Sequence, residues 1–199
     1  MIERQRKTKA PCSGCGLHLQ RCICELMMAL PTRTRVCLVV HAKELKRTTN
    51  TGRLAVKALS NSQMLVRGLG NLDLSTLLTP NYTSLLLYPS ENAIELTAEF
   101  VRTLQPPIQL IVPDGNWRQA SKVHTRHQEL QDIPRVKLPP PAQREMQLRK
   151  ESHPYGMATL EAIASALSIV ENPKTGDYLQ TIYQAKLKQT LAGRQGEWL

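Results

Sequence analysis

The chain has 199 residues, 41% of them hydrophobic, which is enough to form one domain with a buried core. Its formal net charge is +10, and residues 1–60 hold 12 Lys and Arg against 3 Asp and Glu. These totals exclude a disordered chain, and no apolar run approaches the roughly 20 residues that a membrane-spanning helix needs.

The positive charge is concentrated near the start of the chain. Residues 1–10, MIERQRKTKA, form a basic tail without an apolar signal segment, so we expect a cytoplasmic protein. Clustered positive charge is typical of a surface that binds a polyanion, and a solubilising, solvated surface is the alternative. A membrane surface is not expected, because no amphipathic basic helix with aromatic residues accompanies the charge.

A cysteine-rich segment follows the tail and predicts a small unit over residues 11–30. Its cysteines are Cys12, Cys15, Cys22 and Cys24. Four thiols this close together are typical of tetrahedral zinc, with an iron–sulfur cluster or redox chemistry as alternatives. A zinc ion with four protein thiolates has no open position, so it would be structural and would supply folding energy. Cys37 lies in an apolar run and is expected in the core.

Strands and helices alternate along residues 31–199, which we take as the main domain. Apolar and β-branched runs predict strands at 35–41, 63–68, 83–89, 108–114 and 134–138. Helical periodicity predicts helices at 51–61, 93–104, 117–130, 157–171 and 175–193. This alternation indicates an α/β domain with a mostly parallel sheet and helices on both faces. Ligands bind such sheets at the carboxyl ends of the strands.

The loop in IVPDGNWRQASK, residues 111–122, follows a predicted strand directly. Asp114 ends that strand, Gly115 allows a ligand to approach the backbone, and Trp117 offers a flat ring on which a base could stack. The alternative is a purely structural role, because Asp, Gly and Asn are all favourable before a helix and Asn116 could be the N-cap.

Cations accompany two of the predicted helices. In HAKELKRTTNTGRL, residues 41–54, His41 ends a strand and could be functional or structural. The cations of this segment are Lys43, Lys46, Arg47 and Arg53, and they suit a phosphate site beside a helix start. Arg118, Lys122 and Arg126 recur every four residues and share one helix face, which suits phosphates or is simply solvated.

A long loop at 139–156 leads into the last two helices. Backbone N–H groups near Gly156 to Thr159 could hold a carboxylate or another anion, and a plain loop with a cap is the alternative. The sequence has no Walker loop, no G-x-S-x-G elbow and no dinucleotide fingerprint, so kinase and hydrolase functions lose support.

Taken together, the motifs resemble the DTW-domain family of tRNA-uridine aminocarboxypropyltransferases over nearly the whole chain. The resemblance rests on the four-cysteine unit, HAKELKRTTNTGRL at 41–54, YPSE at 88–91, DGNW at 114–117 and SHPYGMATLEA at 152–162. The family's name motif is Asp-x-Thr-Trp, and this chain has Asn116 where Thr is expected.

The resemblance implies a SPOUT-like α/β fold whose C-terminal part threads a trefoil knot to form an S-adenosylmethionine pocket. It implies transfer of the 3-amino-3-carboxypropyl group to N3 of a tRNA uridine, releasing methylthioadenosine; in bacterial relatives this is the variable-loop uridine numbered 47. The implied partner is tRNA, DNA is not expected, and we expect a monomer rather than a dimer. The alternatives are a SPOUT-type RNA methyltransferase and a non-catalytic, zinc-containing RNA-binding protein.

The expected roles of individual residues follow from the resemblance and the loops above. Asp114 is the expected general base and Trp117 the expected stacking surface or pocket wall. The residues expected to hold S-adenosylmethionine, the co-substrate, are Tyr88, Pro89, Ser90, Glu91, Val112, Pro113, Gly115, His153, Tyr155, Gly156, Thr159 and Glu161. The residues expected to bind RNA phosphates are Lys43, Lys46, Arg47, Arg53, Arg118 and Lys122.

Overall fold

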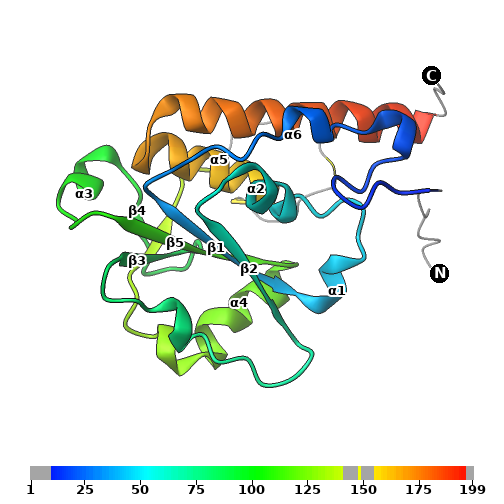
Figure 1. Cartoon of the computed structure of the whole chain (residues 1–199). Coiled ribbons are helices and arrows are strands. Elements are labelled where there is room, and N and C mark those ends of the chain that lie inside the picture. The colour runs from blue at the N-terminus through cyan, green and yellow to red at the C-terminus, as the bar shows by residue number, and fades with distance from the viewer. Residues whose placement is uncertain (1–9, 141–147, 149–154, 196–199) are drawn as a thin grey trace.

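A computed structural model describes residues 10–140, 148 and 155–195, and its centre is one six-stranded sheet (Figure 1). All neighbouring strands pair in parallel, in the order β2-β1-β5-β3-β6-β4. The strands are β1 (Arg35–His41), β2 (Ser62–Arg67), β3 (Thr83–Leu87), β4 (Ile94–Glu95), β5 (Ile108–Asp114) and β6 (Arg135–Lys137). The predicted α/β class with a parallel sheet is confirmed.

Helices cover both faces of the sheet. The α-helices are α1 (Ala42–Leu45), α2 (Gly52–Ala58), α3 (Ala98–Arg102), α4 (Trp117–Arg126), α5 (Thr159–Val170) and α6 (Pro173–Gln195). The short 3-10 helices are η1 (Leu19–Arg21), η2 (Cys24–Leu26), η3 (Ser75–Leu77) and η4 (Gln128–Leu130). None of the helices described is both long and apolar enough to cross a membrane.

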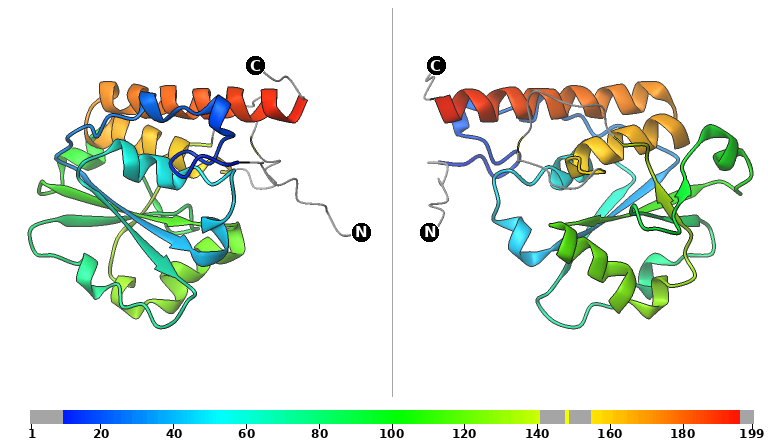
Figure 2. Two further views of the ribbon diagram at one scale, coloured as in Figure 1. Left: turned by 45° about the vertical axis from the view of Figure 1, so that its right-hand side comes forward. Right: turned by 180° about the vertical axis from the view of Figure 1, so that it is seen from behind.

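The central strands β1 and β5 explain why both faces must be covered. They lie side by side, with Val36 opposite Leu110, and their apolar runs are buried along almost their whole length. Side chains alternate between the two faces of a strand, so a continuous apolar run requires a core on each side. One core lies under α2, α5 and α6, and the other lies between the sheet and α4, η3 and η4 (Figure 2).

The connections from these two strands create a crevice at their carboxyl ends. Helix α2 follows β1 on one face of the sheet, whereas α4 follows β5 on the opposite face (Figures 1 and 2). Adjacent parallel strands whose helices leave in opposite directions open a gap beyond the strand ends, which is where ligands bind in open α/β sheets.

Two predicted helices differ from the observed elements. The helix predicted at 93–104 is wrong in its first part, because Ile94–Glu95 pairs with β6 as β4. Helix α3 begins only after Thr97, whose side-chain oxygen accepts from Phe100 N at 3.1 Å and so caps it. The helix predicted at 117–130 ends as α4 at Arg126 and is followed by η4. The other predicted elements are present, with ends that differ by a few residues.

The C-terminal helices α5 and α6 pack closely against each other. A Cβ added to Gly176 in α6 would lie 2.6 Å from Ser168 Cβ and 2.8 Å from the Ala164 carbonyl oxygen of α5, so this crossing requires glycine. The trefoil knot implied for this part of the chain stays a prediction, because residues 141–147 and 149–154 of the connection to α5 lie outside the described residues.

A buried lysine of α6 joins the cysteine-rich segment to the main domain. Lys186 is fully buried, and its Nζ donates hydrogen bonds of 2.7 Å to the carbonyl oxygens of Cys15 and Thr48. Burial lowers the pKa of Lys186 to about 8, opposed by the nearby Cys15 thiol. Cys15, Leu17 and Ile23 belong to the same apolar cluster as α5 and α6, so the segment packs on the domain rather than standing apart.

Replacing Lys186 with Met keeps the length of the side chain but removes the donor for one buried and one partly buried carbonyl group. We expect the free energy of unfolding to fall by about 2 kcal/mol, because buried acceptors without donors are costly. Urea denaturation measures the change. Lys188→Met, on an exposed position of the same helix, is the matched control and should shift the free energy of unfolding by less than about 0.5 kcal/mol. Equal stability of the two variants would contradict a stabilising role for the Lys186 bonds.

Candidate functional site

A cavity of about 370 Å³ opens at the carboxyl ends of the central strands. Its walls come from the loops that follow β1, β3, β5 and β6, together with the start of α5 and one residue of α6, Tyr183. This volume falls within the roughly 300–1,000 Å³ that is typical of small-molecule and cofactor sites. The cavity therefore lies at the crevice that the strand connections create.

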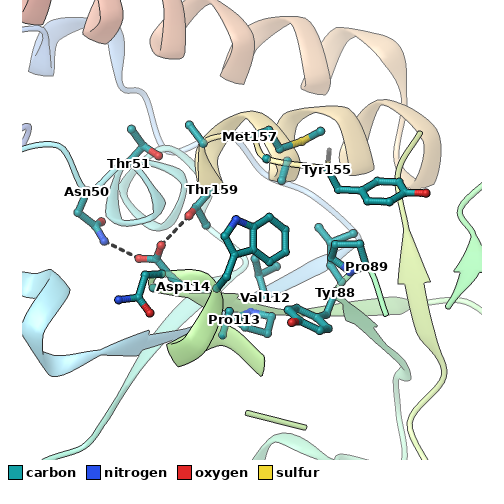
Figure 3. Close-up of a pocket in the computed structure, with 18 of the residues that line it drawn as sticks. Asn50, Thr51, Tyr88, Pro89, Val112, Pro113, Asp114, Tyr155, Met157 and Thr159 are labelled. Atoms are coloured by element: carbon teal, nitrogen blue, oxygen red, sulfur yellow. Dashed lines mark hydrogen bonds between the residues drawn. The ribbon is translucent and has the colours of Figure 1, made fainter. Parts of the chain in front are cut away.

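Asp114, the last residue of β5, lies in this cavity and is only 5% exposed. Its Oδ2 accepts a hydrogen bond from Asn50 Nδ2, and its Oδ1 accepts one from Thr159 Oγ1, both at 2.5 Å (Figure 3). Asn50 precedes α2 and Thr159 is the first residue of α5. One carboxylate thus joins three elements, and the two donors fix its orientation.

The backbone around Asp114 is shaped for this arrangement. A Cβ on Gly52 would lie 3.0 Å from Asp114 Oδ2 and 3.0 Å from Leu38 Cδ1, so α2 begins with a residue that leaves room for the carboxylate. Leu160 N donates to Thr51 Oγ1 at 3.2 Å, which ties the first turn of α5 to the start of α2. Both helices therefore begin beside the carboxylate, where their partial positive charge favours an anion.

An aromatic group forms another part of the site. The Tyr88 ring lies 6.2 Å from the Trp117 ring and 5.1 Å from the His124 ring, measured between centroids. Burial raises the pKa of Tyr88, and burial together with Arg135 lowers the pKa of His124, which in both cases favours the uncharged ring. Tyr88 and Trp117 line the cavity, so the aromatic group offers an apolar wall to a planar ligand.

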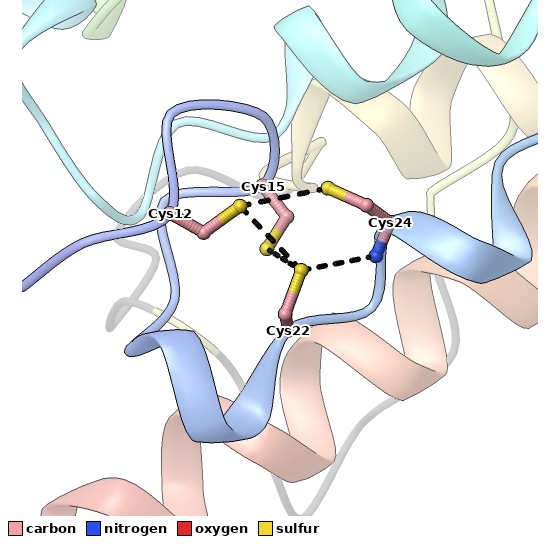
Figure 4. A group of neighbouring side chains, drawn as sticks. All are labelled: Cys12, Cys15, Cys22 and Cys24. Carbon is pink, nitrogen blue, oxygen red and sulfur yellow. Dashed lines mark hydrogen bonds between the residues drawn. The ribbon is translucent and has the colours of Figure 1, made fainter.

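The four cysteines of the N-terminal segment form a separate cluster (Figure 4). Their sulfur atoms all lie within 4.8 Å of one another, with Cys12–Cys22 at 3.4 Å, Cys12–Cys24 at 3.6 Å and Cys15–Cys22 at 3.8 Å. A tetrahedral zinc with bonds of about 2.3 Å requires sulfur–sulfur distances of about 3.8 Å. The group could therefore hold a metal ion, and the expected zinc fits it.

The surroundings of the cluster also fit a group of thiolates. Lys57 Nζ of α2 donates to Cys24 Sγ at 3.4 Å, and such outer contacts balance the charge of metal ligands. A Cβ on Gly14 would lie 2.6 Å from Cys24 Sγ, so glycine at this position leaves room for that thiol. The cluster lies directly against α2.

Comparison with known proteins identifies the family of the chain. The model of the DTW domain matches residues 9–191. The chain belongs to the DTW-domain family. It is also 26% identical over 183 residues to tRNA-uridine aminocarboxypropyltransferase 2 of Macaca fascicularis, in an alignment that covers 87% of this chain and 60% of that relative. The chain thus spans about three fifths of the length of the curated relative it matches. No solved structure matches the chain. The family resemblance that the motifs indicated is confirmed.

The DTW domain brings most of the expected co-substrate residues to the cavity. The expected residues that line it are Tyr88, Pro89, Val112, Pro113, Gly115, Tyr155, Gly156 and Thr159. Ser90 and Glu91 lie in the turn after β3, and Glu161 is buried in the first turn of α5, all outside the cavity lining. His153 lies outside the described residues.

Some lining residues were missed by sequence reasoning. Asn50 was not expected at the site, although the polar run Thr49-Asn50-Thr51 between cations was a usable signal. Tyr183 lies on the buried side of α6 and gives no sequence signal that separates it from a core residue. The position of Tyr183 in the cavity wall depends on how α6 crosses the sheet.

The expected RNA-binding cations occupy three different environments. Lys43, Lys46 and Arg118 are exposed, and Lys122 is partly exposed on α4. Arg53 packs against Gly16, and its Nε is buried without a hydrogen-bond partner among the described residues. Arg47 lines the cavity itself.

The exposed cations lie close enough to influence one another. The pKa of Lys122 is lowered chiefly by Arg126, and further by burial, Arg118 and Arg67. Burial, Arg67, Lys43 and Lys122 lower the pKa of His41, opposed by Glu44, so cations from α1, β2 and α4 lie near this ring. His41 itself has a structural role, because its Nδ1 accepts from Lys43 N at 3.2 Å and caps α1.

Asn116 forms the N-cap of α4, which explains how it can replace the family's threonine. Its Oδ1 accepts from Gln119 N at 2.9 Å, and Gln119 Oε1 accepts from Asn116 N at 2.8 Å, which completes a capping box. A Cβ on Gly115 would lie 2.8 Å from Gln119 Oε1, so glycine leaves room for the Gln119 side chain to reach the backbone of Asn116. A threonine hydroxyl can accept the same bond.

We expect Asn116→Thr to leave stability almost unchanged and Asn116→Ala to lower the free energy of unfolding by about 1 kcal/mol. The reason is that threonine still accepts from Gln119 N, whereas alanine leaves that donor without its cap. Chemical denaturation of the three proteins measures the difference. If the threonine variant were as unstable as the alanine variant, the cap would not explain this position.

We expect Cys12→Ser to lose bound zinc and to unfold at a lower temperature, because a hydroxyl is a poor substitute for a zinc thiolate ligand. Metal analysis of the purified protein and a thermal melt measure the two effects. Cys37→Ala is the matched control, since Cys37 lies in β1 away from the cluster and should leave the metal content unchanged. Full zinc occupancy in Cys12→Ser would contradict the proposed ligand set.

Proposed function

We propose that the protein transfers the 3-amino-3-carboxypropyl group of S-adenosylmethionine to N3 of a tRNA uridine. The observation that carries this proposal is a buried, oriented carboxylate, Asp114, inside a cofactor-sized cavity of a DTW domain. The relative from Macaca fascicularis carries the name of this activity. The variable-loop uridine is the expected position in the tRNA, and the cytoplasm is the expected compartment.

The transfer is a displacement at carbon. The N3 lone pair of the uracil forms a bond to Cγ of the methionine part, and the Cγ–S bond breaks. The bonding electrons remain on sulfur, which turns the sulfonium into the neutral thioether of methylthioadenosine. The N3 proton passes to the carboxylate of Asp114, which acts as general base. Since three carbons on the sulfonium are activated alike, the site selects Cγ by placing it in line with N3.

The cavity suits the two reactants. Tyr88, Pro89 and Tyr155 offer aromatic and apolar surface for the adenosyl part, and Trp117 offers a ring on which the uracil can stack. Asn50 and Thr159 keep the Asp114 carboxylate in one orientation, so the reacting atoms meet a fixed acceptor. Such fixed positioning is a large part of catalysis in a two-substrate reaction.

The positive surface beside the cavity suits the RNA backbone. Lys43, Arg118 and Lys122 lie near the carboxyl ends of β1 and β5, the edge at which the cavity opens. Phosphate contacts of this kind orient an RNA, and the pocket that receives the flipped base supplies the selectivity. The cysteine cluster, with structural zinc, extends this surface through its contact with α2.

The reaction is tested with unmodified tRNA and S-adenosylmethionine that carries label either in the methionine carboxyl or in the methyl group. We expect carboxyl label in the tRNA and no methyl label. Methyl label alone would make the protein an RNA methyltransferase. Label from neither, with the tRNA still bound, would favour a binding protein without catalysis.

In the same assay we expect Asp114→Asn to reduce transfer by about 100-fold or more, because an amide cannot take the N3 proton. Asp177→Asn, on an exposed position of α6 outside the cavity lining, is the control and should transfer at the wild-type rate. A binding measurement with tRNA separates lost catalysis from lost binding. Wild-type transfer by Asp114→Asn would refute the general-base role.

A further inference from the structure

We infer that Arg47 binds the carboxylate of the amino-acid part of S-adenosylmethionine and thereby orients the group that is transferred. The inference rests on the proposed function and assigns one more residue of the same site. Sequence reasoning placed Arg47 among the cations that bind RNA phosphates, whereas in the structure it lines the cavity.

The cavity is divided into a polar end and an apolar end. Asn50, Thr51, Asp114 and Thr159 lie together at one end, and Tyr88, Pro89 and Tyr155 lie at the other (Figure 3). S-adenosylmethionine is divided in the same way, since its adenine is planar and its amino-acid part is charged. Matching the two places the amino-acid part beside Asp114.

Arg47 lies at the polar end. Asn50 N donates to the Arg47 carbonyl oxygen at 3.0 Å, so the two residues share one tight turn. Asn50 in turn bonds to Asp114. Among the lining residues that the structure describes, the second cation is Lys137 of β6. It lies at the apolar end, because β6 pairs with β3 and Tyr88 N donates to the Val136 carbonyl oxygen at 3.0 Å.

The reaction brings a second carboxylate into the cavity that holds Asp114. Only three bonds separate the carboxylate carbon from Cγ, and Cγ must lie beside the uracil N3 whose proton Asp114 takes. The transferred carboxylate can therefore lie near the Asp114 carboxylate in a partly buried cavity. The sulfonium and the ammonium group of the co-substrate offset part of this negative charge, and a cation of the protein beside the transferred carboxylate stabilises it further.

Arg47, which lines the cavity, can supply such a cation through its guanidinium. Its Nη1 lies 3.3 Å from Glu44 Oε1, and the Glu44 side chain is 1% exposed whereas that of Arg47 is 38% exposed. The buried Glu44 anchors one edge of the guanidinium. A guanidinium has five N–H donors in a planar fork that matches a carboxylate, so this anchor uses only part of its capacity.

The test compares two ligands that differ only in the carboxylate: S-adenosylmethionine and its decarboxylated form. Calorimetry on the zinc-containing protein gives the ratio of their affinities, with methylthioadenosine as a ligand that lacks the whole amino-acid part. We expect the wild-type protein to prefer S-adenosylmethionine by on the order of 10- to 100-fold, and Arg47→Met to abolish this preference while binding methylthioadenosine as before. Arg47→Lys should restore part of the preference.

Lys137→Met is the matched control, because it removes a second cation from the described part of the cavity lining, and it should retain the wild-type preference. A preference that survives in Arg47→Met, or that is lost in Lys137→Met instead, would overturn the inference and leave the proposed function standing. A wild-type protein that binds neither S-adenosylmethionine nor methylthioadenosine would overturn both.

Discussion

The site depends on how the buried carboxylate of Asp114 is solvated by the protein itself. A buried anion is costly unless donors replace the water it has lost. Here the donors are Asn50, 64 residues earlier in the chain, and Thr159, 45 residues later. The bonds form only when β5 lies beside β1 and α5 begins over the same edge of the sheet. The fold and the geometry of the carboxylate are therefore coupled.

Features encoded locally were predictable from the sequence. The apolar runs of β1 and β5 predicted buried strands, the spacing of Cys12 to Cys24 predicted a metal cluster, and the order of the motifs predicted the DTW family. In each case the signal is a property of a short segment. The position of Asp114 in the cavity was also predictable, because a polar residue at the carboxyl end of a buried strand lies where ligands bind in such sheets.

Features that depend on tertiary contacts were not predictable in the same way. Ile94–Glu95 has the composition of a helix start, but it becomes β4 because the edge of β6 is open to pairing. Asn50 and Arg47 lie in one basic loop, and the sequence of this loop does not indicate which of its residues reach the cavity. Only the packing of the loop against β5 places these two in the cavity wall. Composition describes the charge of a segment, whereas function depends on which side of the loop each charge faces.

The loop between α1 and α2 also connects the cysteine cluster to the cavity. Between α1 and α2 the chain has little regular structure, and its backbone is held at Thr48 by Lys186, whose ammonium group also holds Cys15. Gly16 of the cluster packs against Arg53, and Lys57 contacts Cys24, so α2 is fixed to the cluster at two points. Thr48 is two residues from Asn50 and one from Arg47. A metal ion bound by the cluster would thus also restrain the loop that orients Asp114. The proposed structural zinc would then influence the geometry of the proposed transfer without lying near the reacting atoms.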